Sequence, residues 1–305
     1  MRAVATAGLV AMALTTMAAN AVAKDYEVVT RPDITYVERD GVKLVGDLYR
    51  PKGLDKAPAL VAVHGGGWQR GGRDIYKYWG PYLAKNGYAV FSIEYRLMKP
   101  NVKTYPGAVY DVKAAIQFVR AKAADLGVDP DRIALMGDSA GAHLSALVAL
   151  AQNEPPFAAA DPGNSNTATS AAVKAVVGFY GVYDMLAQWQ HDQLARPNDQ
   201  ISAKFLGAPP MVNRRLYFEG SPISYATVDK KGPRFLLIHG TADDIVDPTT
   251  QSDAFLIALK GAGFFVRTIV VPGAGHFWTE DPVEEPGSYG AYAAPKVLRF
   301  LAGAL

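Results

Sequence analysis

Short apolar runs alternate along the chain with longer segments that have helical spacing. The apolar runs cover residues 59–63, 89–93, 132–136, 173–180, 234–238 and 265–271. Runs that stay apolar at consecutive positions are typical of strands covered on both faces. The intervening segments, such as residues 105–125 and 248–261, place apolar residues at the spacing of an amphipathic helix. This order predicts an α/β fold built on a mostly parallel sheet with right-handed crossovers.

Three segments depart from this alternation. Residues 34–38 and 43–49 are extended and flank the turn Asp40-Gly41, which predicts an antiparallel hairpin at the start of the sheet. Residues 155–170 are rich in alanine, asparagine, serine and proline and are expected to form a surface loop. Residues 185–227 combine aromatic residues with several prolines between two predicted core strands. A long excursion at such a place is expected to form a small cap.

The composition narrows the class of protein. Of the 305 residues, 50% are apolar and 20% are charged, which is typical of a folded globular protein. Lysine and arginine number 31 against 29 acidic residues, so no broad electrostatic field favours nucleic-acid binding. The chain has no cysteine, which excludes disulfides, thiolate metal sites and cysteine nucleophiles. Any nucleophile must therefore be an oxygen or an amine.

The N-terminus has the pattern of an export signal. Arg2 is followed by an uncharged run that closes on Ala21-Val22-Ala23, a small-x-small cleavage site. We expect residues 1–23 to be a signal peptide cleaved after Ala23, leaving one domain over residues 24–305 in the periplasm or outside a bacterium, with no membrane attachment. An uncleaved membrane anchor is the alternative, because the uncharged run is just long enough to cross a bilayer, which takes roughly 20 residues. Its threonines and Asn20 weaken that alternative.

The sharpest local motif is Gly137-Asp138-Ser139-Ala140-Gly141. It follows the predicted strand 132–136 and opens a helical run over residues 142–151. This context is typical of a nucleophile elbow, a turn so tight that its flanking positions require glycine. Ser139 would then stand above the carboxyl edge of the sheet. An ordinary turn between a strand and a helix is the alternative.

A second motif, His64-Gly65-Gly66-Gly67-Trp68, follows the predicted strand 59–63. Consecutive glycines let backbone N–H groups approach a ligand closely, which suits a developing oxyanion. A phosphate-binding loop is a poor match, because Gly72 and Arg73 stand where it requires lysine and a hydroxyl residue. A merely flexible loop is the remaining alternative.

Together these motifs resemble the α/β-hydrolase fold and, within it, the hormone-sensitive-lipase-like esterases that carry an HGGG oxyanion motif. Secreted carboxylesterases and feruloyl or acetyl esterases of the same fold are similar as well. The resemblance implies a mostly parallel eight-stranded sheet, with helices on both faces and a small cap insertion. It also implies that the N–H groups of Gly66, Gly67 and Ala140 bind the oxyanion, and that serine, acid and histidine follow one another along the chain. The segment after Tyr95 departs from the lipase-like pattern.

The order of residues selects the base and the acid. Of the five histidines, only His276 follows every candidate acid. Asp243 fits the HG-x-x-D-x-x-V pattern of related hydrolases, and Asp244 is the fallback. Asp247 precedes Pro248 at the head of a predicted helix, where an aspartate is expected to cap the helix. Asp184 is expected to begin the cap.

The resulting hypothesis is a serine carboxylesterase that acts on small esters through an acyl-enzyme. By analogy with secreted esterases, acetyl or feruloyl esters of carbohydrates are expected substrates. Neither a metal nor an organic cofactor is implied. Trp68 and Trp278, beside the glycine loop and the base, are expected to contact the substrate. Two alternatives stay open: an amidase, formamidase or peptidase with the same catalytic residues, and a non-catalytic binding protein on the same fold.

Overall fold

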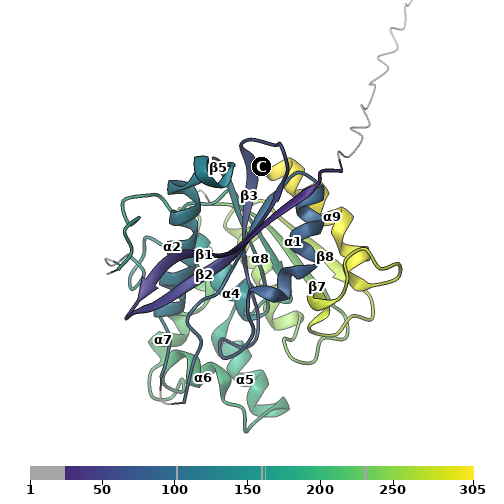
Figure 1. The fold of residues 1–305 in the computed structure, drawn as a ribbon. Helices are drawn as coiled ribbons and strands as arrows, with labels where there is room; N and C mark the ends of the chain where they lie inside the picture. The colour runs from purple at the N-terminus through teal and green to yellow at the C-terminus, as the bar shows by residue number, and fades with distance from the viewer. Residues whose placement is uncertain (1–24, 101, 159–160, 162, 230–231) are drawn as a thin grey trace, which may run out of the picture.

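An eight-stranded sheet forms the centre of the computed structural model, which describes residues 25–305 except 101, 159–160, 162 and 230–231 (Figure 1). The strand order is β1-β2-β4-β3-β5-β6-β7-β8. The strands are β1 (Val28–Arg39), β2 (Val42–Pro51), β3 (Ala57–Val63), β4 (Ala89–Ile93), β5 (Val128–Asp138), β6 (Ala175–Phe179), β7 (Arg234–Gly240) and β8 (Val266–Val271). The sheet of the α/β-hydrolase fold expected from the resemblance is therefore confirmed.

The two ends of the sheet differ in strand direction. β1 and β2 form the predicted antiparallel hairpin, and both residues of its turn, Asp40 and Gly41, have positive φ angles of 49° and 78°. Positive φ at both positions suits the right-handed twist of paired strands. β2 also pairs antiparallel with β4, whereas every pair from β4 to β8 is parallel. The carboxyl ends of β3 to β8 therefore lie along one edge.

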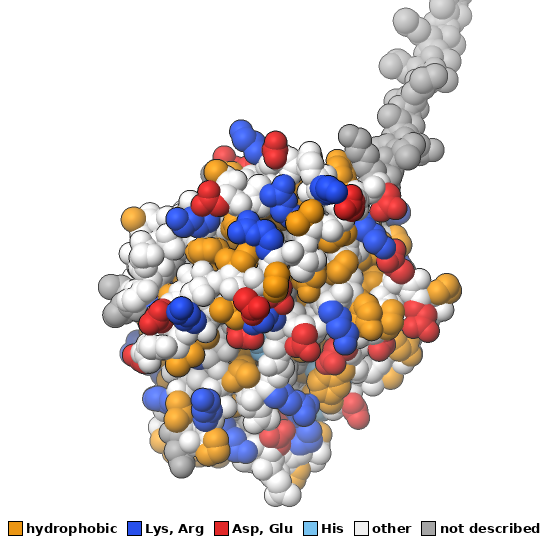
Figure 2. Space-filling view, in the orientation of Figure 1, with side chains coloured by type: hydrophobic (Ala, Val, Ile, Leu, Met, Phe, Trp, Pro, Cys, Tyr) orange, Lys and Arg blue, Asp and Glu red, His pale blue; other side chains and the backbone are white. Residues whose placement is uncertain are grey.

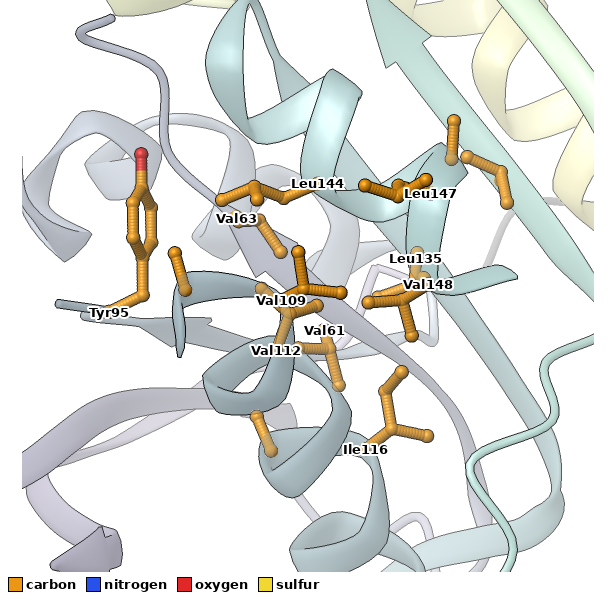
Figure 3. Close-up of a cluster of buried hydrophobic side chains, with 14 of the residues drawn as sticks. Val61, Val63, Tyr95, Val109, Val112, Ile116, Leu135, Leu144, Leu147 and Val148 are labelled. Atoms are coloured by element: carbon orange, nitrogen blue, oxygen red, sulfur yellow. The ribbon is translucent and has the colours of Figure 1, made fainter. Parts of the chain in front are cut away.

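Helices cover both faces of this sheet. The longer ones are α1 (Trp79–Lys85), α2 (Gly107–Ala121), α4 (Ala140–Ala151), α8 (Ala254–Gly261) and α9 (Tyr289–Ala304), with the single turn α3 (Ala123–Leu126) after α2. Val61 and Val63 of β3 pack against α2 and α4 on one face (Figure 3). Leu60 and Ala62 point to the opposite face, into the cluster that contains residues of α1 and α9. This alternation makes β3 apolar at every position, as the continuous run predicted.

The chain leaves the sheet between β6 and β7 to form three short helices and a 3₁₀ turn. They are α5 (Met185–Ala195), α6 (Ile201–Leu206), α7 (Arg214–Glu219) and η2 (Pro222–Tyr225), and Figure 1 places α5 to α7 together at one end of the molecule. We call residues 185–225 the cap segment. Asp184 caps α5, because its carboxylate accepts the N–H groups of Leu186 and Ala187 at 2.8 and 3.0 Å.

The remaining segments are 3₁₀ turns and one short π-helix: η1 (Arg73–Lys77), η3 (Thr249–Asp253, the π-helix) and η4 (Trp278–Glu280). Residues 1–23, the predicted signal peptide, lie outside the described residues. Over residues 25–305, with the gaps given above, no helix is both long enough and apolar enough to cross a bilayer.

Candidate active site

The turn between β5 and α4 is strained at one residue. Ser139 has φ 50° and ψ −118°, a conformation that side-chain-bearing residues rarely adopt. A Cβ atom at Gly137 would come within 2.4 Å of the Gly141 carbonyl oxygen, and one at Gly141 within 1.9 Å of the Val63 carbonyl oxygen. Both flanking positions therefore require glycine, as the sequence predicted for a nucleophile elbow.

Three side chains from distant parts of the sequence meet above this turn. The Ser139 hydroxyl lies 3.0 Å from Nε2 of His276, and Nδ1 of His276 lies 2.8 Å from Oδ2 of Asp243. The His276 and Asp243 side chains are only 2% and 0% exposed. A serine, an imidazole and a buried carboxylate in this order form the arrangement that activates a hydroxyl for nucleophilic attack.

The acid loop after β7 shows why Asp243 rather than its neighbours occupies this place. Oδ1 of Asp243 accepts the N–H groups of Ile245 and Val246, each at 3.0 Å, which leaves Oδ2 aimed at His276. Asp244 is exposed, and its backbone carbonyl contacts the ring of His191 from the cap segment at 3.0 Å. The sequence left these two aspartates as alternatives, and the contacts select Asp243.

Asp247 has the structural role that its position before Pro248 predicted. Its carboxylate accepts the backbone N–H groups of Thr249 and Thr250 at 3.2 and 3.1 Å, at the start of η3. These bonds satisfy two of the free N–H groups that begin every helix. Asp247 is thus engaged in the turn that leads into α8.

The glycine loop follows β3, whose last residue, Val63, pairs directly with Gly137 of β5. This register puts the loop beside the elbow. Gly66 and Gly67 line the same pocket as Ser139 and Ala140, and neither glycine N–H is hydrogen-bonded to another described residue. The Ala140 N–H belongs to the first turn of α4, where helix N–H groups lack partners within the helix. The three expected oxyanion donors therefore surround one small space.

His64 holds the start of the loop. Its Nδ1–H donates to the Gly65 carbonyl at 2.7 Å, and its ring stacks on Tyr95 with a 4.3 Å centroid separation. The Tyr95 hydroxyl in turn donates to the His64 carbonyl at 3.0 Å. Burial lowers the pKa of His64 to about 4, so the ring is neutral at physiological pH.

Asp138 links the elbow to the glycine loop, a role that the motif alone did not reveal. Its Oδ1 accepts the Gly65 N–H at 3.0 Å and the Tyr76 hydroxyl at 2.9 Å. Burial raises the pKa of this carboxyl group to about 7, and both hydrogen bonds oppose that rise. The available sequence signal was an acidic residue directly before the candidate nucleophile.

His143 connects the loop, the elbow helix and the cap segment. Its Nδ1 accepts the indole N–H of Trp68 at 3.1 Å, and its Nε2–H donates to the Gly220 carbonyl at 2.7 Å. Both ring nitrogens are thereby used by one neutral tautomer, and burial lowers the pKa of His143 to about 4. The order of the chain excluded His143 as the base, and these contacts give it a structural role instead.

The pocket above Ser139 is small, with about 70 Å³ of free space. Its walls come from the glycine loop, the elbow, the acid and base loops and the cap segment. They include Gly66, Gly67, Trp68, Gln69, Arg70, Ser139, Ala140, Val182, Gln188, Arg196, Asp199, Ile201, Ile245, Val246, His276 and Phe277. A narrow pocket open to solvent is suited to a small group attached to a larger one.

The two tryptophans expected to contact substrate are both buried. Trp68 borders the pocket but is 2% exposed, because its ring stacks on Phe205 at 4.6 Å and its N–H bonds to His143. Trp278 is 3% exposed, packs against Phe179 and Tyr180, and is not among the residues that line the pocket. The substrate-contact prediction is therefore wrong for Trp278, because the chain after His276 turns it into the core. The neighbouring Phe277 lines the pocket instead.

Comparisons with known proteins show that the chain is similar to esterases. The esterase LipQ of Mycobacterium tuberculosis is 38% identical over 225 residues, which are 72% of this chain and 50% of LipQ. A probable carboxylic ester hydrolase of the same organism, LipM, is 34% identical over 75% of this chain and 51% of its own length. The chain thus matches about half the length of these curated relatives.

Solved structures extend the similarity to most of the chain. A truncated carbohydrate esterase from gut microbiota has a TM-score of 0.74 at 27% identity, covering 92% of this chain and 97% of that one. Esterase 2 of Thermogutta terrifontis, phosphorylated by paraoxon, has a TM-score of 0.66 at 28% identity, covering 91% and 92%. Residues 46–259 also match the family described as BD-FAE, a segment that runs from β2 into α8 and includes Ser139 and Asp243. The chain belongs to the BD-FAE family of α/β-hydrolases.

Proposed function

We propose that this protein is a serine carboxylesterase that hydrolyses carboxylic esters through an acyl-enzyme. The observation that carries the proposal is the continuous hydrogen-bonded chain from Ser139 through His276 to Asp243, with distances of 3.0 and 2.8 Å. Such a chain lets an imidazole take the hydroxyl proton while the carboxylate keeps the ring in the required tautomer.

In the first half of the reaction, Ser139 Oγ attacks the ester carbonyl and its proton passes to Nε2 of His276. Negative charge then develops on the carbonyl oxygen, where the N–H groups of Gly66, Gly67 and Ala140 stabilise it. The tetrahedral intermediate collapses when His276 protonates the departing alcohol. In the second half, His276 takes a proton from water as that water attacks the acyl-serine. The second tetrahedral intermediate collapses when His276 returns the proton to Ser139 Oγ, which releases the carboxylic acid and restores the free serine.

Two measurements test this proposal: the labelling of Ser139, and the relative rates on an ester and on the matching anilide. Wild-type protein is expected to hydrolyse 4-nitrophenyl acetate and to be labelled once, at Ser139, by an organophosphonate. Ser139→Ala is expected to lose at least about 10⁴-fold in kcat with an unchanged unfolding curve. Failure of the wild type to label would favour a non-catalytic binding protein. Faster cleavage of 4-nitroacetanilide than of the matched ester would make the protein an amidase.

We propose short acyl groups on carbohydrates as the substrate class, with acetyl esters ahead of feruloyl esters. The free space of about 70 Å³ above Ser139 supports this order, because a feruloyl group carries an aromatic ring and a propenoyl chain. The similarity to a carbohydrate esterase supports the sugar component. Initial rates on acetylated xylan and methyl ferulate would test the order, and a preference for the ferulate would reverse it.

We also propose that the protein is exported and that residues 1–23 are removed. The small-x-small site at Ala21-Val22-Ala23 supports cleavage after Ala23. N-terminal sequencing of protein recovered from the periplasm or culture medium is expected to begin at Lys24. A sequence that starts at Met1 would contradict the proposal.

A further inference from the structure

A second, larger cavity lies beside the small pocket and shares Gln69 and Arg70 with it. This cavity has about 1090 Å³ of free space, against about 70 Å³ in the pocket. Its walls come from the glycine loop, the segment after β4 and the end of α6. The residues are Gln69, Arg70, Met98, Lys99, Pro100, Val102, Lys103, Ala203, Lys204, Gly207, Ala208 and Pro209. We call this cavity the basic groove.

The charge of the basic groove has one sign. Arg70, Lys99, Lys103 and Lys204 line it, and no aspartate or glutamate is among its lining residues. None of the four cations forms a salt bridge with a carboxylate in the part of the chain that the structure describes. Figure 2 shows basic side chains at the end of the molecule where Figure 1 places α6 and α7. Because the whole chain has a net charge of only +2, this clustering is local.

Lys103 is seated in the groove by a glycine from another segment. A Cβ atom at Gly207 would lie 2.6 Å from Cδ and 3.4 Å from Nζ of Lys103. The lysine stem therefore crosses the position that any larger residue at 207 would fill, and it brings the ammonium group to the end of α6. Lys204 lies in the last turn of the same helix. The two lysines thus come from separate segments of the chain and line the same cavity.

The groove continues the side of the site from which the alcohol leaves. His276 protonates the departing alcohol in the proposed mechanism, so the alcohol component lies on the His276 side of Ser139. The Phe277 ring contacts His276 edge-on at 4.5 Å, and the Arg70 guanidinium lies over Phe277, 5.8 Å from its centroid. A bulky alcohol that passes Phe277 therefore meets Arg70 and then the groove.

We propose that the basic groove binds the carboxylates of an acidic oligosaccharide whose acetyl ester is cleaved at Ser139. This rests on the proposed esterase function and defines its substrate further. The small pocket holds the acetyl group, and the larger, cationic groove holds the sugar acids. Carboxylates on successive sugars would contact separate cations, which a single small anion could not do.

Matched substrates test the preference for charge. Acetylated oligogalacturonate is compared with the same oligomer after its carboxylates are converted to primary amides. Wild-type kcat/KM is expected to be higher for the acid form, and added salt is expected to remove the difference. The double variant Lys103→Gln/Lys204→Gln is expected to lose about tenfold in kcat/KM on the acid form, through KM. Its rate on 4-nitrophenyl acetate should stay unchanged, as should both rates in Lys122→Gln, a control at an exposed lysine after α2.

Direct binding separates this proposal from the esterase proposal. Calorimetry with oligogalacturonate that carries no acetyl group is expected to show binding to Ser139→Ala, and weaker binding when Lys103 and Lys204 are also replaced. If 4-nitrophenyl acetate is not hydrolysed, the esterase proposal fails and the calorimetry alone decides the groove. Equal kcat/KM for acid and amide forms, or an equal loss in Lys122→Gln, would overturn the basic groove as an anion site.

Discussion

The loops at the carboxyl edge of the sheet and the cap segment position their residues by different means. The glycine loop, the elbow and the acid loop directly follow β3, β5 and β7, and His276 lies five residues after β8. Their relative positions follow from strand pairing, such as that of Val63 with Gly137. The cap segment has no strand, its helices α6 and α7 are six residues long, and Leu194 on α5 is 89% exposed.

This difference divides the residues that carry out the reaction from those that contact the rest of the substrate. Groups set by hydrogen-bonded strands are held to the precision that catalysis requires, whereas short helices held by side-chain contacts are easier to displace. The cap segment contributes Gln188, Arg196 and Ile201 to the pocket wall and Lys204 to the basic groove, but no member of the Ser139–His276–Asp243 chain. Changes at the sheet edge should therefore lower kcat, and changes in the cap segment should mainly raise KM.

After Ser139→Ala, the largest effect is expected from the acid of the sheet edge. Asp243→Asn would leave the side-chain shape intact but would remove the carboxylate that accepts the His276 Nδ1–H. We expect a loss of about 10³- to 10⁴-fold in kcat, measured with 4-nitrophenyl acetate. Asp244→Asn, one residue further along the same loop, is the matched control and should change kcat less than about threefold. A comparable loss in both variants would contradict the assignment of Asp243.

A second experiment breaks the elbow itself. Gly141→Ala would place a methyl group within 1.9 Å of the carbonyl oxygen of Val63, the last residue of β3. We expect the free energy of unfolding to fall by about 3 kcal/mol, measured by urea denaturation, together with a loss of activity. Gly303→Ala is the control, because no atom lies within 4 Å of a Cβ at that position. Near-wild-type stability of Gly141→Ala would show that the elbow tolerates displacement.

A third experiment addresses Asp138, the buried last residue of β5. Because its pKa is raised from 3.8 to about 7 in the folded protein, the protonated group stabilises the fold at low pH. That contribution is full below about pH 4 and is lost as the pH rises through 7. Between pH 5 and 8 the wild type should lose about 2–3 kcal/mol of unfolding free energy relative to Asp138→Asn. Parallel pH profiles for the two proteins in urea denaturation would contradict the raised pKa.

The smallest effect is expected where the sheet edge meets the cap segment. Trp68→Phe would remove the indole N–H that bonds to His143 and would leave a buried acceptor unsatisfied. We expect the free energy of unfolding, measured by urea denaturation, to fall by about 1–2 kcal/mol, which is what such a loss costs. Trp278→Phe is a matched control, since its buried indole N–H has no partner among the described residues and it does not line the pocket. Equal effects of the two substitutions would remove the special role of the Trp68–His143 bond.

The sequence predicted those features that depend on residue order and local geometry. Apolar runs located the strands of the parallel part, with residues 89–93 matching β4 at both ends. The glycines flanking Ser139 indicated the elbow because no other residue fits there. The order of the chain left only His276 as the base, which the geometry places 3.0 Å from Ser139.

Features that depend on burial were harder to predict. Asp138 and His143 lie inside or beside the elbow motif, yet their partners come from Gly65, Trp68 and Gly220, which are distant in sequence. Trp278 lies two residues after the base, and only the turn of the chain after His276 decides that its ring faces the core. In each case the role of the side chain depends on which distant segment packs against it, and the local sequence does not indicate that segment.

The loop over residues 155–170 shows the same limit. Its composition predicted a solvated surface segment, but Asp161 within it is 8% exposed and pairs with the buried Arg39 at 2.6 Å. Arg39 also contacts Asp111 of α2, which is fully buried. The expectation of a purely surface loop is therefore wrong at Asp161. Charged residues are buried only with partners, and this partner lies 122 residues away.

The pairing of Val63 with Gly137 has a consequence for how the protein fails when heated. The strands that carry the glycine loop and Ser139 are neighbours in the sheet. A large separation of the Ser139 hydroxyl from the loop amides therefore requires the hydrogen bonds between β3 and β5 to break. Thermal inactivation toward small acetates should therefore coincide with global melting. Discrimination among larger esters, which involves the cap segment, should be lost on heating at a temperature below that of global melting.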